Sequence, residues 1–286
     1  MEFIASGWKD YVVIDAGDKE KLERWGDVTL RRPDPQSIWP KEFPNLWNTS
    51  DADYIRSSTG GGKWSFKKKL PERWQIAYND IKFYVRPTGF KHTGLFPEQA
   101  VNWDFMMDKI KKAQRKIKVL NLFAYTGGAT LACLKAGAEV VHVDAAKSMV
   151  NWAKENVQLS GLKDYPVRFI VDDCLKFVLR ELRRQNTYDA IIMDPPSYGR
   201  GADGQLWKIE ENIYSLVAQS VKLLSLDPLF FIINSYTTGL SPIVTKNILI
   251  RTLKGKEGTF EAGEIALPIE KSKTLLPCGA TTRWFR

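Results

Sequence analysis

Cysteine is scarce in this chain of 286 residues, and long apolar runs are absent. Cys133, Cys174 and Cys278 are odd in number and form no Cys-x-x-Cys pair, so we expect neither a disulfide framework nor a zinc site. No apolar run approaches the roughly 18–20 residues that span a bilayer. The first ten residues lack the charged and apolar regions of a secretion signal. These features predict a cytoplasmic protein that binds no metal and no membrane.

The charge balance favours anionic partners. Lys and Arg number 42 and Asp and Glu number 33, which gives a net charge of +9. Such a surface attracts polyanions over a screening length of about 8–10 Å. Many soluble proteins carry a similar excess, so charge alone does not identify RNA as the partner.

The first part of the chain, residues 1–95, holds six of the ten tryptophans. It also contains short strand-like segments separated by Gly, Pro, Asn and Asp, a pattern typical of a small antiparallel β domain. The candidate strands cover residues 11–15, 28–31, 63–69 and 81–86. We interpret residues 1–95 as a β-rich, substrate-binding domain.

In residues 96–286 strands alternate with helices, which predicts an α/β domain with a largely parallel sheet. The seven expected strands cover residues 117–123, 139–144, 167–172, 190–194, 229–235, 260–267 and 274–284. The six expected helices cover residues 98–112, 128–136, 147–159, 174–184, 207–224 and 242–253. The last two strands have no helix between them, which fits a seven-stranded Rossmann-like sheet whose final strand enters antiparallel.

A cofactor site is expected where the strand at residues 117–123 runs into the glycine pair Gly127-Gly128 that opens a helix. Such a loop lies at the carboxyl edge of the sheet, where ligands bind. Glycines let the backbone approach a cofactor closely. Asp144, at the end of the next strand, follows at close to the ~20-residue separation at which a carboxylate binds ribose hydroxyls. Asp173, after the third strand, is placed to accept a hydrogen bond from an adenine amino group.

The cofactor indicated is S-adenosylmethionine. The loop of residues 123–130 fails the G-x-G-x-x-G pattern of nicotinamide cofactors, whereas a glycine pair, two acids and an Asp-Pro-Pro motif each follow a different strand. The alternative for the acids is that they only cap the helices that follow them. The cofactor contacts expected from these loops are Asn121, Phe123, Ala124, Tyr125, Thr126, Gly127, Gly128, Asp144, Ala145, Asp173 and Cys174.

The predicted transfer site is Asp194-Pro195-Pro196. Methyl transfer from a sulfonium is an in-line displacement, so the protein mainly aligns the nucleophile and excludes water. The prolines fix the backbone and aim the Asp194 carboxylate and the Pro195 carbonyl at one amino group. Tyr198 is the candidate for stacking on the acceptor, one position later than in related motifs because Ser197 intervenes. The alternative is a turn that only ends the strand.

Cysteine-dependent chemistry is disfavoured. Formation of 5-methylcytosine needs a thiolate after the prolines of this motif or after the next strand. Those places hold Ser197 and residues 233–236, without a cysteine. The accepting atom is therefore expected to be nitrogen, with oxygen less favoured.

These motifs resemble the large-subunit ribosomal RNA methyltransferase family, in which a class I methyltransferase domain follows a β domain. The resemblance runs from about Trp8 to the last residue and is most specific in residues 91–103, 121–128, 194–199 and 234–242. It implies that a Thr-Gly-x-Phe segment closes over the cofactor, with contacts from Thr93, Gly94 and Phe96. Cysteine-using members carry Ser-Cys-Ser where this chain has Asn-Ser-Tyr at residues 234–236, so their cytosine product is not expected.

Residues 64–74 interleave aromatic side chains with cations, a pattern that can stack bases and neutralise phosphates. The same alternation describes an ordinary strand with one buried face. Together the features predict a methyltransferase acting on RNA, with ribosomal RNA as the first candidate. N-methylation of a protein or small molecule is the alternative, and an RNA-binding module without catalysis is a third option. The oligomeric state stays open, with a homodimer among the options.

Overall fold

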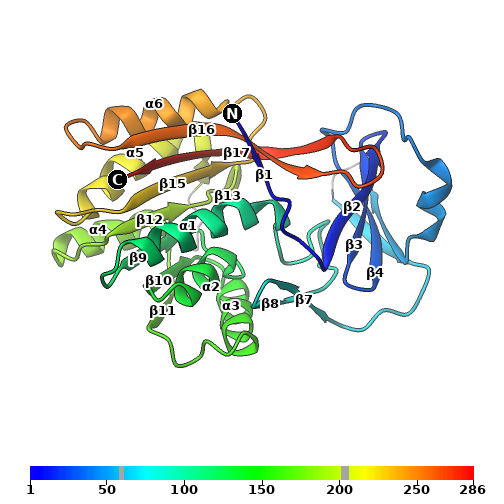
Figure 1. The fold of residues 1–286 in the computed structure, drawn as a ribbon, viewed down its shortest axis with the longest axis horizontal. Helices are drawn as coiled ribbons and strands as arrows, with labels where there is room; N and C mark the ends of the chain where they lie inside the picture. The colour runs from blue at the N-terminus through cyan, green and yellow to red at the C-terminus, as the bar shows by residue number, and fades with distance from the viewer. Residues whose placement is uncertain (58–60, 201–205) are drawn as a thin grey trace. The chain divides into compact units, whose positions relative to one another are not determined.

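The computed structural model describes residues 1–57, 61–200 and 206–286, except for the side chain of Arg200. The chain forms two compact units (Figure 1). The first, here the α/β unit, comprises Met1–Phe3, Asn102–Glu264 and Gly279–Arg286. The second, here the β unit, comprises Ile4–Val101 and Ile265–Cys278. From the sequence we expected one boundary near residue 95. The observed division is not a single cut, because Ile265–Cys278 belongs to the β unit.

The main sheet has eight strands in the order β1-β16-β17-β15-β12-β9-β10-β11. Their bounds are β1 Glu2–Ile4, β9 Lys118–Leu122, β10 Glu139–Asp144, β11 Val167–Val171, β12 Ala190–Met193, β15 Phe230–Ser235, β16 Thr259–Pro268 and β17 Leu275–Phe285. The strands from β11 to β15 pair in parallel, and β17 enters antiparallel to β15. The predicted α/β class is confirmed. The short edge strand β1 is an addition that the sequence did not indicate.

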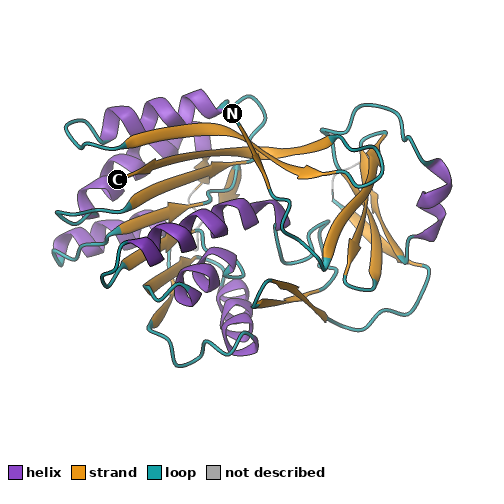
Figure 2. Cartoon of the chain, in the orientation of Figure 1, coloured by secondary structure: helices purple, strands orange, loops and turns teal. Residues whose placement is uncertain are grey.

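Among the described residues, α-helices cover both faces of this sheet; Figure 2 draws helices in purple. They are α1 Ala100–Lys112, α2 Gly128–Lys135, α3 Lys147–Leu159, α4 Cys174–Arg183, α5 Ile209–Ser220 and α6 Pro242–Thr252, with short 3-10 turns at Pro97–Gln99 and Val221–Leu223. Helices α1, α2 and α3 gather on one face and α4, α5 and α6 on the other (Figure 1). Central strands are therefore covered on both faces, and all four residues of β12 are buried. No helix within the described ranges is long and apolar enough to cross a membrane.

The β unit contains a five-stranded sheet, β2-β3-β4-β5-β6, and a two-stranded one, β7-β8. Their bounds are β2 Tyr11–Gly17, β3 Glu20–Trp25, β4 Val28–Pro33, β5 Ala52–Arg56, β6 Gly62–Phe66, β7 Trp74–Tyr78 and β8 Ile81–Val85, with a 3-10 turn at Pro44–Thr49. Pairing is antiparallel except between β4 and β5. Trp25, Leu30 and Phe83 form its apolar interior. The expected antiparallel β region is confirmed in all but that one pair.

Candidate active site

The carboxyl ends of the parallel strands bring the predicted cofactor and transfer motifs to one edge of the sheet. β9 leads into the loop that begins at Phe123, β10 ends at Asp144, and β12 is followed by Asp194. The backbone N–H of Asp194 donates to the Leu122 carbonyl at 3.4 Å. The Asp-Pro-Pro motif and the glycine loop therefore start side by side, at the edge where ligands of α/β sheets bind.

The loop between β9 and α2 has an unusual backbone. Phe123, Tyr125 and Gly127 have φ values of 54°, 50° and 91°. A non-glycine residue in this left-handed region costs about 1–2 kcal/mol, and such residues cluster at ligand sites. The Tyr125 N–H donates to Asp144 Oδ2 at 2.8 Å, and the Gly127 N–H donates to the Ala124 carbonyl at 3.0 Å. Neighbouring strands thus hold a tight turn in place.

Gly127 and Gly128 are each required in this loop, for different structural reasons. Gly127 adopts the positive φ that favours glycine. At Gly128 an added Cβ would lie 2.6 Å from Cζ2 of Trp103 on α1. The missing side chain of Gly128 therefore makes room for a tryptophan. The predicted contact of Gly128 with the cofactor stays a prediction.

Asp144 connects two backbone segments around the predicted ribose site. Its Oδ1 accepts from the Ala146 N–H at 2.8 Å, as Oδ2 does from Tyr125. Burial raises the pKa of Asp144 although both hydrogen bonds oppose the shift. Each carboxylate oxygen has two acceptor sites, so both retain capacity for a ribose hydroxyl. Ala145 lies between Asp144 and Ala146 in the chain, and its contact with the cofactor stays a prediction.

The third strand end shows the capping role that was the alternative for Asp173. Its Oδ1 accepts from the Lys176 N–H at 2.9 Å at the start of α4. Cys174 is buried, and its Sγ accepts from the Phe123 N–H at 3.3 Å. Burial raises the pKa of the Cys174 thiol well above its usual value. The contact of Asp173 with adenine stays a prediction.

Asn121 lies inside the sheet–helix interface. Its amide donates to Thr130 Oγ1 at 3.0 Å, and Thr130 Oγ1 is 2.9 Å from Nδ1 of the buried His142. Burial lowers the pKa of His142 to about 3, so its ring is neutral. A further residue that the sequence did not single out, Asn156 on α3, donates to the Thr126 carbonyl at 2.9 Å. These buried bonds anchor α2 and the glycine loop.

The Asp-Pro-Pro segment is fixed by residues that sequence reasoning missed. Pro195 is buried, whereas Pro196 is exposed. The Trp207 indole N–H donates to the Pro196 carbonyl at 2.6 Å, and its ring lies 5.2 Å from the Phe123 ring. Trp207 belongs to β14 (Leu206–Lys208), which pairs with β13 (Tyr198–Arg200). No short-range pattern in the sequence links this tryptophan to the prolines.

Tyr198 opens β13 with 57% of its surface exposed, so its ring is accessible. The neighbouring Ser197 hydroxyl accepts from Thr237 Oγ1 at 2.6 Å. Thr237 follows β15, so the ends of β12 and β15 are joined directly beside the transfer motif.

Comparison with known proteins identifies the family. A model of S-adenosylmethionine-dependent methyltransferases matches residues 55–218, more than half of the chain. The chain belongs to this family. A S-adenosylmethionine-dependent methyltransferase structure from Agrobacterium tumefaciens is 36% identical, with a TM-score of 0.95 over 100% of this chain and 93% of that one. The predicted membership of the S-adenosylmethionine-dependent methyltransferases and the predicted cofactor are confirmed.

Other relatives of this methyltransferase align over a smaller share of the two chains or at lower sequence identity. A ribosomal RNA large subunit methyltransferase K/L from Pseudoalteromonas atlantica is 35% identical over 164 residues, which is 57% of this chain and 22% of that protein. The chain thus spans about a fifth of the length of the curated relatives it matches. A candidate methyltransferase from Streptococcus mutans is 18% identical, with a TM-score of 0.76 over 97% of this chain and 76% of that one, and it shows the shared fold alone.

Thr93, Gly94 and Phe96 of the methyltransferase lie in the β unit. Thr93 is fully buried, and its carbonyl accepts from the Arg86 N–H at 3.0 Å. Gly94 has a φ of 92°, and the Phe96 ring lies 5.6 Å from that of His92. Burial and nearby cations lower the pKa of His92 to about 4. The cofactor contacts of these three residues stay predictions.

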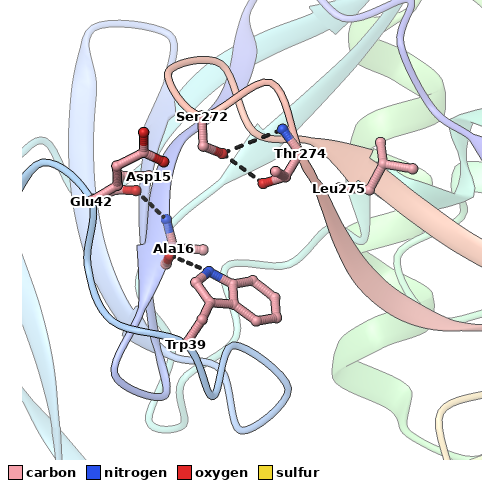
Figure 3. Close-up of a pocket in the computed structure, with 7 residues that line it drawn as sticks. All are labelled: Asp15, Ala16, Trp39, Glu42, Ser272, Thr274 and Leu275. Atoms are coloured by element: carbon pink, nitrogen blue, oxygen red, sulfur yellow. Dashed lines mark hydrogen bonds between the residues drawn. The ribbon is translucent and has the colours of Figure 1, made fainter.

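A pocket of about 230 Å³ in the β unit contains none of the predicted site residues (Figure 3). Its Asp15 carboxylate accepts from the Trp47 indole at 2.8 Å and from the Ala16 N–H at 3.0 Å. The Trp39 indole donates to the Ala16 carbonyl at 2.7 Å. These hydrogen bonds join β2 to Trp39 and Trp47 in the segment that follows β4. Within the described residues, no group of three or more His, Cys, Asp or Glu could hold a metal ion.

Proposed function

We propose that this protein transfers a methyl group from S-adenosylmethionine to a base nitrogen of RNA in the cytoplasm, with ribosomal RNA as the first candidate. The observation that carries the proposal is the adjacency of Asp194-Pro195-Pro196 to the β9 loop, through the bond between the Asp194 N–H and the Leu122 carbonyl. The name of the ribosomal RNA large subunit methyltransferase relatives supports an RNA acceptor. The net charge of +9 is consistent with a polyanion.

The residues of the α/β unit fit this cofactor. The Asp144 carboxylate ends β10 with acceptor capacity for ribose hydroxyls, and it holds the turn from Phe123 to Gly127 through the Tyr125 N–H. Asp173 and Cys174 would border the adenine. S-adenosylmethionine supplies an electrophilic methyl group on its sulfonium. The protein has to hold it in line with the accepting atom and to exclude water.

Asp194 and its neighbours would orient the acceptor. The Asp194 carboxylate and the Pro195 carbonyl would accept hydrogen bonds from an amino group and leave its lone pair directed at the methyl group. The Pro196 carbonyl is already engaged by Trp207, which fixes the turn. The exposed ring of Tyr198 would stack on the base.

The cysteines support a mechanism without a protein thiolate. Cys133 and Cys174 are buried in the α/β unit, and burial raises the pKa of both thiols. Burial also raises the pKa of Cys278 in the β unit. Since the thiolate is the nucleophilic form, none of the three is suited to attack a pyrimidine ring.

The proposal is tested by methyl transfer from radiolabelled S-adenosylmethionine to the separated RNA, protein and metabolite fractions of a lysate. The lysate comes from cells without this protein, and Asp194→Ala is the control. Label in ribosomal RNA that the variant fails to introduce is the expected result. Label confined to protein or metabolites would replace RNA by the alternative acceptor class, and no label in any fraction would contradict catalysis.

A further inference from the structure

The β unit carries exposed aromatic side chains at the edge of its larger sheet. β6 is the last strand of the order β2-β3-β4-β5-β6, so its outer side has no neighbouring strand among the described residues. Phe66 on β6 is 54% exposed, and Phe90, in the loop after β8, is 69% exposed. Together with Trp64 they form what we call the aromatic edge.

The rings of the aromatic edge are held in a fixed arrangement. Trp64 and Phe66 stack with an interplanar angle of 28° and centroids 6.4 Å apart. Tyr54 of β5 supports Trp64 from its edge at 5.4 Å. The Trp64 indole N–H donates to the carbonyls of Thr88 at 2.9 Å and Phe90 at 3.1 Å. These bonds tie the loop that carries Phe90 to the strand that carries Phe66.

Lysines precede and follow the aromatic residues of β6 in the sequence. Lys63 and Lys69 are exposed and form no ion pair with any described residue. Lys67 and Lys68 pair with Asp53 at 3.1 Å and Asp51 at 2.5 Å. Lys63 and Lys69 thus stay available for anions, while Lys67 and Lys68 each already have a carboxylate partner.

A hollow adjoins this surface. Tyr54, Ile55 and Arg56 of β5, the strand paired with β6, line a pocket of about 490 Å³. Its wall also contains Lys19 and Arg31, together with acidic side chains. The aromatic edge and a polar hollow therefore involve neighbouring strands of one sheet.

We propose that the aromatic edge binds single-stranded RNA, with bases stacked on Phe66 and Phe90 and phosphates close to Lys63 and Lys69. The inference rests on the proposed function and assigns part of its substrate contact to the β unit. Stacking platforms flanked by cations bind single strands with little sequence preference, because every base has a π-face. Lysines on an edge strand oppose the addition of another β-strand, which argues against an extended peptide as the occupant.

The test is fluorescence anisotropy of a labelled single-stranded RNA with the full-length protein. Phe66→Ala and Phe90→Ala are each expected to weaken binding about five- to 150-fold, the range for loss of one stacked base. Phe66→Trp should retain binding, whereas Phe66→Leu, which keeps an apolar side chain without a π-face, should not. Ile38→Ala removes another exposed apolar side chain of the β unit and should change nothing.

Charge and strand state provide independent readouts. Lys63→Gln and Lys69→Gln should each reduce the slope of log affinity against log salt by about 0.7. An RNA duplex should compete less well than a single strand. Wild-type affinity in Phe66→Ala and Phe90→Ala, or equal competition by the duplex, would overturn the proposal.

Methyl transfer by the same variants separates the two proposals. RNA methylation that is unaffected by Phe66→Ala at limiting RNA would overturn the RNA-binding role of the aromatic edge and leave the proposed function intact. Weakened RNA binding in the variants, with no methylation of RNA by the wild-type protein, would support the edge and contradict the proposed function.

Discussion

Asp144 ends β10, and this position lets its carboxylate bond backbone N–H groups of two loops. It fixes the backbone at Tyr125 and Ala146 and keeps acceptor capacity toward the predicted cofactor. An exposed carboxylate with neither backbone bond would be less well placed for this work. The positions of the two bonds explain why an acid is needed here rather than any polar group.

Asp144→Asn should weaken the binding of S-adenosylmethionine. Loss of charged hydrogen bonds costs about 1.5–3 kcal/mol, or about ten- to 150-fold in Kd. Isothermal titration calorimetry measures the effect. Glu139→Gln alters the exposed acid that begins the same strand and serves as the matched control. An unchanged Kd in Asp144→Asn would exclude the assigned role.

Trp207 is expected to act on the rate of transfer through the Asp-Pro-Pro turn. Trp207→Phe keeps an aromatic ring beside Phe123 but removes the indole bond to the Pro196 carbonyl. We expect kcat to fall about five- to tenfold, as for loss of one hydrogen bond, with the Kd for S-adenosylmethionine unchanged. Leu206→Ala, at the exposed neighbour, is the control. Equal losses in both variants would point to general disruption of the strand pair.

At the scale of elements, the close packing of α1 against α2 requires a glycine at position 128. Gly128→Ala would bring a methyl group against the buried Trp103, whose ring cannot move freely in a packed interior. Overpacking of this kind costs about 1–3 kcal/mol of unfolding free energy. Denaturant unfolding gives the value. Gly89→Ala, which meets no atom within 4 Å, should leave stability nearly unchanged, and equal behaviour of the two variants would contradict the packing role.

Elements with a clear hydrophobic period could be predicted from the sequence. β10 and α3 have the expected bounds, because their apolar residues follow the periods of a buried strand and an amphipathic helix. β3 was not expected because its sequence is dominated by charge, and its Glu23 is buried only by virtue of its partners Arg32 and Tyr11. Partners distant along the chain cannot be read from a local pattern.

In the candidate site, the positions of residues at strand ends could be predicted, but contacts between separate loops could not. Residues at strand ends, such as Asp144 and Asp194, follow from the alternation of strands and helices together with the parallel-sheet rule. Trp207 and Thr237 could not be found in this way, because their hydrogen bonds to Pro196 and Ser197 join separate loops. The packing reason for Gly128 likewise depends on a tryptophan 25 positions earlier, at Trp103.

At the scale of the whole molecule, stability should depend on pH through a buried carboxylate. Glu23 is fully buried and accepts two bonds from Arg32, at 2.6 and 2.9 Å. Burial alone would raise the pKa of Glu23, but the charges of Arg32 and Lys21 and the bonds from Arg32 and Tyr11 lower it to about 2. Its contribution is therefore complete above the unfolded value of 4.5 and is lost as the pH falls toward 2.

Glu23→Gln tests this linkage. The variant leaves the Arg32 charge without its carboxylate, so we expect a loss of about 3–5 kcal/mol at neutral pH. Its stability should also fall less steeply below pH 4.5 than that of the wild type. Glu42→Gln, at an exposed position of the same unit, is the control. Denaturant titrations across this pH range would contradict the account if the two variants had the same profile.

Net charge and substrate class are also properties of the whole molecule. If the protein neutralises 6–10 phosphates of an RNA, its affinity for that RNA should fall by about 10³–10⁵ between about 50 and 200 mM salt. Binding of S-adenosylmethionine should change little over the same range, which makes it an internal control. A flat salt dependence for RNA would favour a small-molecule acceptor in spite of the charge of +9.

The proposed role of the Asp194 carboxylate is to orient an RNA base nitrogen for methyl transfer. Methyl incorporation into purified ribosomal RNA by the wild type and by Asp194→Ala, with digestion to nucleosides and mass spectrometry, tests this role. Alanine is used because the side-chain carbonyl of asparagine would still accept a hydrogen bond. We expect an N-methylated nucleoside from the wild type, and from the variant a loss of product with unchanged cofactor binding. A C5-methylated pyrimidine, or full turnover by Asp194→Ala, would rule this role out.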